Sequence, residues 1–171
     1  MSDDFIKDTY IYTTFDVAMY MVDVLKEKDI RFSIAKVQQL LYIVYGVYLT
    51  AYDERLLSDH PAAQYYGPFF PYLEEDLLQM DWNQVAMNSN QVQEEELKKI
   101  KGDPKLNDVL EFVIYHFADL TFNELQDLLR DEDSTWKKAC DRKDFRWGDY
   151  ISDEDIRKAF WVEYAIYMDG Y

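Results

Sequence analysis

The sequence predicts an all-α fold, with about six helices around one buried central helix and at most one short hairpin. Three observations lead to this prediction. Apolar residues recur at steps of three and four, residues typical of helix N-termini precede these stretches, and residues 37–52 contain no charged side chain. Apolar residues at this period indicate helices, and a helix without charge on any face belongs in a core.

The first two predicted helices begin at hydroxyl residues. Thr13 or Thr14 caps a helix that ends near Lys28, and its apolar stripe comprises Val17, Ala18, Met21, Val22 and Leu25. Ser33 caps the next helix, whose stripe comprises Ile34, Val37, Leu41, Val44, Tyr48 and Ala51. Because residues 37–52 are uncharged on the other faces as well, we expect this second helix to be the central one.

The helical pattern breaks after residue 53. His60-Pro61 and Gly67-Pro68 indicate loops, and residues 62–66 could form a short extended segment. Pro71 then suits the first position of another helix. Residues 81–103 are polar, so we expect a mobile connector there. Any short hairpin in the fold is expected within this connector.

The second half of the chain predicts three further helices and a short one. Asp103 and Pro104 open the first, and Thr121 with Glu124 forms a capping box for the second. Ser134 precedes the short helix, which carries Trp136. Ser152 with Asp155 opens the last helix, which we expect to run to about residue 167. We expect residues 1–12 to form an N-terminal arm and residues 13–171 to form a single helical domain.

The composition excludes several classes of function. The chain has 171 residues, with 18 Lys and Arg against 34 Asp and Glu, which gives a net charge of −16. Binding to nucleic acids or anionic membranes depends on cationic residues, so we expect neither as a direct partner. An acidic protein instead attracts a basic partner. The single cysteine, Cys140, allows no internal disulfide, and we expect a cytoplasmic protein.

The sequence offers little for catalysis. The two histidines, His60 and His116, stand in no recognisable hydrolytic motif, and Cys140 has no nearby His or Cys with which to hold zinc. Acidic clusters at residues 74–76, 131–133 and 153–155 could bind Mg²⁺ or Ca²⁺, although they lack the pattern of a calcium loop. We therefore expect no cofactor and no enzyme, with a metal-dependent enzyme that uses an acidic cluster as the open alternative.

Aromatic residues are the more informative feature. Tyr42, Tyr45, Tyr48 and Tyr52 share one broad side of the central helix, and residues 65–72 carry five further aromatic side chains. Large rings can fill a core, with the tyrosine hydroxyl groups bonded at its margin. On a proline-stiffened loop they can also anchor a binding partner.

In their order and spacing these segments resemble the Panacea domain family of phage-associated proteins and bacterial antitoxins, once a domain of unknown function. The resemblance covers residues 13–167 and rests on Phe15-Asp16-Val17-Ala18, Val37-Gln38-Gln39-Leu40-Leu41-Tyr42, Gly46-Val47-Tyr48-Leu49, Tyr66-Gly67-Pro68, and Ser134 with Trp136. The family usually has lysine where this chain has Gln39, and residues 80–102 match no part of its pattern.

The resemblance implies an antitoxin that neutralises a cognate protein toxin by direct binding. The acidic surface would suit a basic toxin. A proteolytic adaptor that passes its partner to a protease, or a phage-associated regulator, is the alternative within the family. A protein that mimics the charge of a nucleic acid stays open as well.

The candidate partner-binding residues are Gln38, Tyr42, Tyr66, Gly67, Pro68, Phe69 and Trp136. Three of them have structural alternatives. Gln38 could instead satisfy a buried backbone group of the Tyr-Gly-Pro loop, Gly67 could only permit a turn, and Trp136 could only anchor the core. On this interpretation, Tyr66→Ala with Phe69→Ala should abolish toxin neutralisation and leave the thermal melt nearly unchanged.

Overall fold

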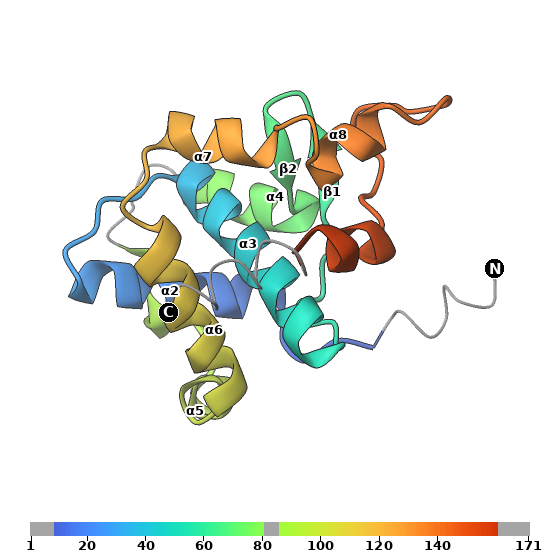
Figure 1. Cartoon of the computed structure of the whole chain (residues 1–171). Coiled ribbons are helices and arrows are strands. Elements are labelled where there is room, and N and C mark those ends of the chain that lie inside the picture. Colours follow the sequence, from blue (N-terminus) through green and yellow to red (C-terminus); the bar gives the residue numbers. More distant parts are fainter. Residues whose placement is uncertain (1–8, 81–85, 161–171) are drawn as a thin grey trace.

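Helix α3 (Ile34–Tyr52) runs through the middle of the protein, as Figure 1 shows for this computed structural model. The structure describes residues 9–80 and 86–160. Every residue of α3 from Val37 to Leu49 is buried, and the Ser33 side chain caps the helix by accepting a hydrogen bond from the Lys36 N–H. The predicted central helix is confirmed. So is the all-α fold class, because the described elements are helices apart from one two-stranded hairpin.

Helices α2 (Thr14–Glu27), α6 (Pro104–Phe117) and α7 (Phe122–Leu129) pack against α3. Each begins where the sequence predicts a cap. The Thr13 and Asp103 side chains accept hydrogen bonds from the first turns of α2 and α6. Thr121 and Glu124 form the predicted capping box of α7. The caps satisfy N–H groups that a helix leaves unpaired at its start, which is why these sequence signals locate the helices well.

The hairpin lies elsewhere than predicted. Strands β1 (Ala62–Gln64) and β2 (Gly67–Phe69) pair in antiparallel fashion, with Ala62 opposite Phe69. The prediction placed a hairpin in residues 81–103 and gave only an extended segment to residues 62–66. Tyr65-Tyr66 is not a usual turn pair, and Gly67 allows the hairpin by taking a φ of +134°. Helix α4 (Pro71–Gln79) follows and begins at the predicted proline.

The prediction of a mobile connector over residues 81–103 is wrong for the part that the structure describes. A 3₁₀ turn, η2 (Ser89–Gln91), and helix α5 (Glu94–Lys101) lie there, and α5 packs against α2 and α6. Three glutamates open α5 and three lysines close it, which complements the helix dipole. Its apolar positions are few, so the helical period is weak in the sequence. Residues 81–85 lie outside the described part.

The C-terminal elements complete the core. Helix α8 (Thr135–Cys140) begins after the predicted cap Ser134, and residues 153–160 are helical after Ser152. The predicted continuation to residue 167 lies outside the described residues, as do residues 1–8 of the predicted arm. Among the described helices, none is long and apolar enough to cross a membrane.

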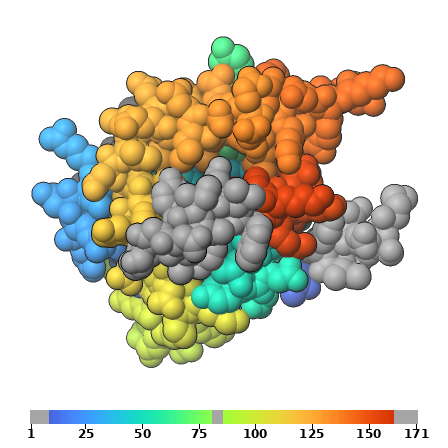
Figure 2. Space-filling view, in the orientation of Figure 1, coloured from blue at the N-terminus to red at the C-terminus, as the bar shows by residue number. Residues whose placement is uncertain are grey.

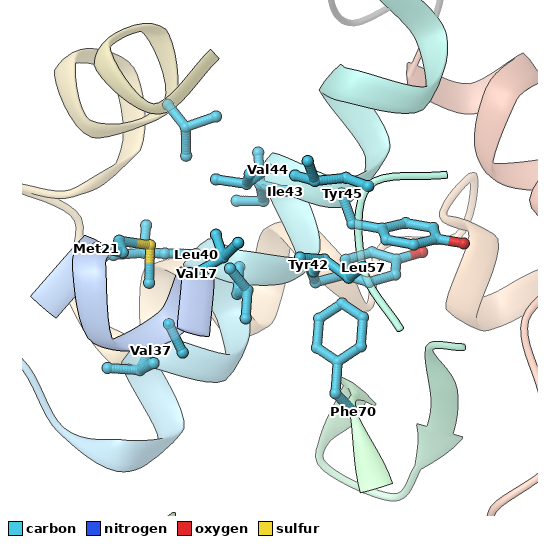
Figure 3. Close-up of a cluster of buried hydrophobic side chains, with 14 of the residues drawn as sticks. Val17, Met21, Val37, Leu40, Tyr42, Ile43, Val44, Tyr45, Leu57 and Phe70 are labelled. Atoms are coloured by element: carbon cyan, nitrogen blue, oxygen red, sulfur yellow. The ribbon is translucent and has the colours of Figure 1, made fainter. Parts of the chain in front are cut away.

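The tyrosines of α3 fill the core. Tyr42, Tyr45 and Tyr48 are buried, and Figure 3 shows the Tyr42 and Tyr45 rings extending from α3 with Phe70 reaching toward them. The Tyr45 and Phe70 rings meet edge to face, 5.8 Å apart between centroids. The Tyr45 hydroxyl donates to Asp153 Oδ1 at 2.6 Å, and the Tyr42 hydroxyl bonds with the Thr135 hydroxyl. Of the two interpretations of these tyrosines, core filling is therefore correct.

Candidate functional site

A pocket of about 210 Å³ opens where the start of α3, the hairpin and α7 meet. Its walls are mainly apolar, and polar groups stand among them. The lining residues are Ile34, Ala35, Gln38, Gln39, Tyr66, Gly67, Pro68, Glu74, Phe122, Gln126 and Leu129. In Figure 2 the atoms of α7 and α8, in orange, form one continuous surface, and the turn of the hairpin, in green, projects at its upper edge.

Gln38 braces the floor of this pocket. Its amide Nε2 donates to the Phe70 carbonyl oxygen at 3.1 Å, and its Oε1 accepts from the Phe70 N–H at 2.8 Å. Both groups are buried, where an unpaired backbone donor or acceptor would be costly. The structural alternative for Gln38, a bond to buried backbone beside the Tyr-Gly-Pro loop, is thereby confirmed.

Tyr66 forms the rim of the pocket. Its side chain is 39% exposed, and its hydroxyl donates to Glu74 Oε1 at 2.6 Å. Burial and the nearby Glu74 carboxylate raise the pKa of Tyr66 above its usual value, so the phenol stays protonated. From α7, Gln126 Nε2 donates to the Tyr66 carbonyl oxygen at 3.2 Å. These bonds hold the hairpin turn against α4 and α7.

Gln39 brings a buried acceptor to the pocket wall. The side chain is 6% exposed, and its Nε2 donates to the Phe122 carbonyl oxygen at 3.2 Å. This bond fixes the orientation of the amide, because the flipped form would set two oxygens against each other. Within residues 9–80 and 86–160, the Gln39 Oε1 has no hydrogen-bond partner.

The structure brings together four of the seven predicted partner-binding residues. Gln38, Tyr66, Gly67 and Pro68 line the pocket, whereas Tyr42, Phe69 and Trp136 do not. Phe69 is only 4% exposed, so Phe69→Ala would leave a cavity that costs about 3–5 kcal/mol. The burial of Phe69 therefore changes the expectation for Tyr66→Ala with Phe69→Ala: this variant should lower the thermal melt.

The two histidines make aromatic contacts in the part of the chain that the structure describes. His60 packs against Tyr150, and His116 packs against Phe112 on α6. Burial, with Asp141 nearby, raises the pKa of the Cys140 thiol, which disfavours the thiolate form. Among the residues that the structure describes, no three His, Cys, Asp or Glu side chains gather into a metal site.

Comparison with known families shows where the chain belongs. The family model described as "Antitoxin SocA-like, Panacea domain" matches residues 37–137, more than half of the chain. The protein is a member of the Panacea domain family. No curated protein and no solved structure gave a match to the chain.

The family match includes most of the pocket of this Panacea domain. Nine of the lining residues fall within residues 37–137, and Ile34 and Ala35 lie just before them. The predicted resemblance is therefore confirmed over the segments that carry Gln38, Tyr66 and Trp136. The family description makes the protein antitoxin-like and implies a protein partner.

The Panacea domain also carries a surface cluster that the sequence analysis missed. We call Tyr65, Arg130, Trp136, Phe145 and Trp147 the hairpin cluster. The Trp136 and Trp147 rings stack with centroids 6.3 Å apart, and the Tyr65 and Phe145 rings meet Trp147 edge-on. Tyr65 is 69% exposed and Trp147 is 52% exposed. Phe145 and Trp147, which are separated by a single residue in a loop, were the sequence signal that could have indicated this cluster.

Trp136 joins the cluster to the hairpin. Its ring is buried, and its indole N–H donates to the Gln64 carbonyl oxygen at 2.6 Å. Trp136 thus has the contacts of a core anchor, as its structural alternative predicted. Its stacking partner Trp147 faces solvent. Gly67 stands between the pocket and the cluster, since a Cβ there would lie 3.8 Å from Arg130 Cγ.

Proposed function

We propose that this Panacea domain is a cytoplasmic antitoxin that neutralises a basic protein toxin by direct binding, without catalysis. The observation that carries the proposal is the pocket at Tyr66, Gly67 and Pro68, which lies within an antitoxin-like family match and contains four residues predicted for partner binding. Neutralisation requires only an interface that covers the toxin or holds it inactive.

The chemistry of the pocket favours a long basic side chain of the toxin. Ile34, Phe122 and Leu129 supply apolar wall for an aliphatic stem. The Glu74 carboxylate, at the rim, is an acceptor for a cationic head group. Lysine and arginine combine such a stem with such a head. The pocket is smaller than the roughly 300–1,000 Å³ of sites for drug-sized ligands, which suits one side chain.

The overall charge supports the same partner. A net charge of −16 creates a field that attracts a basic protein and orients its approach. A field of this kind raises the association rate more than the final affinity, so close packing in the pocket must supply specificity. The pocket and the charge therefore have separate roles in recognition.

The test is to express the neighbouring reading frame alone and together with this chain, and to score growth. We expect toxicity alone and rescue by the wild type. Ala35→Met fills the pocket from a helical position and should abolish rescue. Ala51→Met changes an exposed residue of the same helix outside the pocket and should rescue fully.

Three outcomes would count against the proposal. Rescue by Ala35→Met, with an unchanged thermal melt, would place the interface elsewhere. Absence of any toxicity from the neighbouring protein would contradict the antitoxin role. Rescue accompanied by protease-dependent loss of the toxin on an immunoblot would make the protein a proteolytic adaptor instead.

A further inference from the structure

Arg130 holds a positive charge at the centre of the hairpin cluster. The residue follows α7, and its guanidinium carbon lies 5.0 Å from the centroid of the Trp136 ring and 5.5 Å from that of Tyr65. Such placement over two aromatic faces is a favourable cation–π arrangement. It also fixes where the guanidinium group sits.

Arg130 lacks the partners that a guanidinium group usually has. Its Nε is buried and makes no hydrogen bond within the described part of the chain. Asp131, Glu132 and Asp133 follow it directly, yet the ion pairs found among the described residues do not include Arg130. Lys137 of α8, by contrast, is paired with Asp141 at 3.1 Å. Within the described residues Arg130 therefore has no paired carboxylate, and it lies beside the exposed rings of Tyr65 and Trp147.

The surrounding rings make this a preformed surface. Trp136 is fixed by its bond to Gln64, and Trp147 stacks on it with an angle of 22° between the ring planes. Tyr65 closes the other side, with its ring 5.9 Å from that of Trp147. The exposed Trp147 and Tyr65 side chains beside the half-buried Arg130 have the composition of a binding hot spot.

We infer that the hairpin cluster binds a carboxylate group of the protein partner, with Arg130 as its ligand and an adjacent apolar side chain packed on Tyr65 and Trp147. Because Nε is buried, the two Nη groups of the planar guanidinium face the carboxylate and form two charge-assisted hydrogen bonds with it. The binding chemistry does not depend on what the partner does. That the partner is a toxin rests on the proposed function.

This assignment gives the two parts of the surface different tasks. The acidic exterior attracts a basic protein in many orientations, whereas Arg130, held by the rings and paired with no described carboxylate, favours an orientation that presents an acidic residue to it. Matched charges of this kind fix the register of a complex and disfavour wrong partners. Arg130 is thus a specificity-determining residue of the interface.

The test uses the whole chain and two blocked dipeptides, N-acetyl-phenylalanyl-glutamate amide and its glutamine counterpart, as millimolar probes. Nuclear magnetic resonance follows the arginine Nε–H and tryptophan indole N–H signals during titration. We expect the glutamate probe to shift the Arg130 and Trp147 signals saturably, with an affinity about tenfold above that of the glutamine probe.

Variants separate the fork from the charge. Arg130→Gln should abolish the preference for glutamate, and Arg130→Lys, which keeps the charge and loses the fork, should weaken it severalfold. Lys138→Gln removes one charge from an exposed position of α8 and should leave binding unchanged. Thermal melts of all three variants check the fold.

Equal binding of both dipeptides, or binding that survives Arg130→Gln, would overturn the inference. So would inorganic phosphate, titrated alone, that shifts the same signals as strongly as the glutamate probe, because the site would then recognise a phosphoryl anion. The titration needs no toxin. Its failure would leave the growth rescue standing, and a failed rescue would leave the carboxylate site standing.

Discussion

Gln38 and Phe70 are joined by two hydrogen bonds between one side-chain amide and one peptide unit. Gln38 Nε2 donates to the Phe70 carbonyl oxygen and Gln38 Oε1 accepts from the Phe70 N–H, at 3.1 and 2.8 Å. This pair ties the central helix to the end of the hairpin and so sets the position of Tyr66 and Pro68 at the pocket. The geometry of the proposed binding surface therefore depends on a polar contact inside the core.

Replacing Gln38 should destabilise the fold. Gln38→Leu keeps most of the volume and leaves two buried backbone groups unpaired, so we expect a loss of about 2–4 kcal/mol in the free energy of unfolding. Urea denaturation measures this value. Gln126→Ala, which removes an amide bonded to the more exposed Tyr66 carbonyl, is the control and should cost less than about 1 kcal/mol. Equal losses in both variants would contradict the role of Gln38.

Asp59 should make stability depend on mildly acidic pH. The carboxylate is buried and accepts from the Leu73 N–H at the start of α4, and burial raises its pKa above the usual value. The folded state then binds a proton at higher pH than the unfolded state does. As the pH falls from about 7 to about 4, the wild type should therefore gain stability relative to Asp59→Asn, measured by urea denaturation at each pH. If the wild type instead loses stability relative to Asp59→Asn as the pH falls, the pKa assignment for Asp59 is refuted.

Tyr45 should contribute to unfolding in alkali. Burial and the bonded Asp153 raise the pKa of Tyr45 above its usual value. Above about pH 10 the unfolded chain loses the phenol proton while the folded chain keeps it, so stability falls as the pH rises. Tyr45→Phe should show a shallower fall, by up to about 1.4 kcal/mol per pH unit. The exposed Tyr72 supplies the matched control, Tyr72→Phe. If the unfolding free energies of wild type and Tyr45→Phe fall with pH at the same slope, the prediction is contradicted.

Gly46 is required by the close approach of Phe160. A Cβ at Gly46 would lie 2.6 Å from three atoms of the Phe160 ring, so Gly46→Ala should cost about 1–3 kcal/mol. In a Phe160→Ala background the obstacle is gone. There the same change should be neutral or stabilising by up to about 1 kcal/mol, because alanine favours a helix. A double-mutant cycle by denaturation measures this reversal, and a cost that persists in both backgrounds would disprove it.

The sequence predicts the parts of this fold that local chemistry decides. Ser33, Asp103 and Thr121 satisfy the first N–H groups of their helices, so the signal and its effect lie a few residues apart. Helix α3 is uncharged on every face over residues 37–52, and only a central position removes all of these faces from water. Helix α5 escaped prediction because its stability comes from charge placement and from contact with α2 and α6.

The candidate site was predictable only in part, because contacts distant in the sequence create it. Tyr66 and Phe69 are both aromatic residues of the same short segment, so the sequence does not distinguish them. The pairing of the hairpin strands leaves Tyr66 exposed and Phe69 buried. The hairpin cluster brings Tyr65 next to Trp147 from the far end of the chain, which no local pattern indicates. Gln38 was the exception, since an amide on an apolar helix must find a buried partner.

Hydrogen–deuterium exchange of this chain, alone and mixed with the product of the neighbouring reading frame, the proposed toxin, tests the central claim most directly. The account predicts that binding slows exchange in the hairpin, residues 62–69, and in α7 with Arg130, residues 122–130. The exposed helix α5, on another part of the molecule, should exchange unchanged and serves as the internal reference. Slowed exchange confined to α5 and α6, with the hairpin and α7 unaffected, would contradict docking at the pocket and the hairpin cluster.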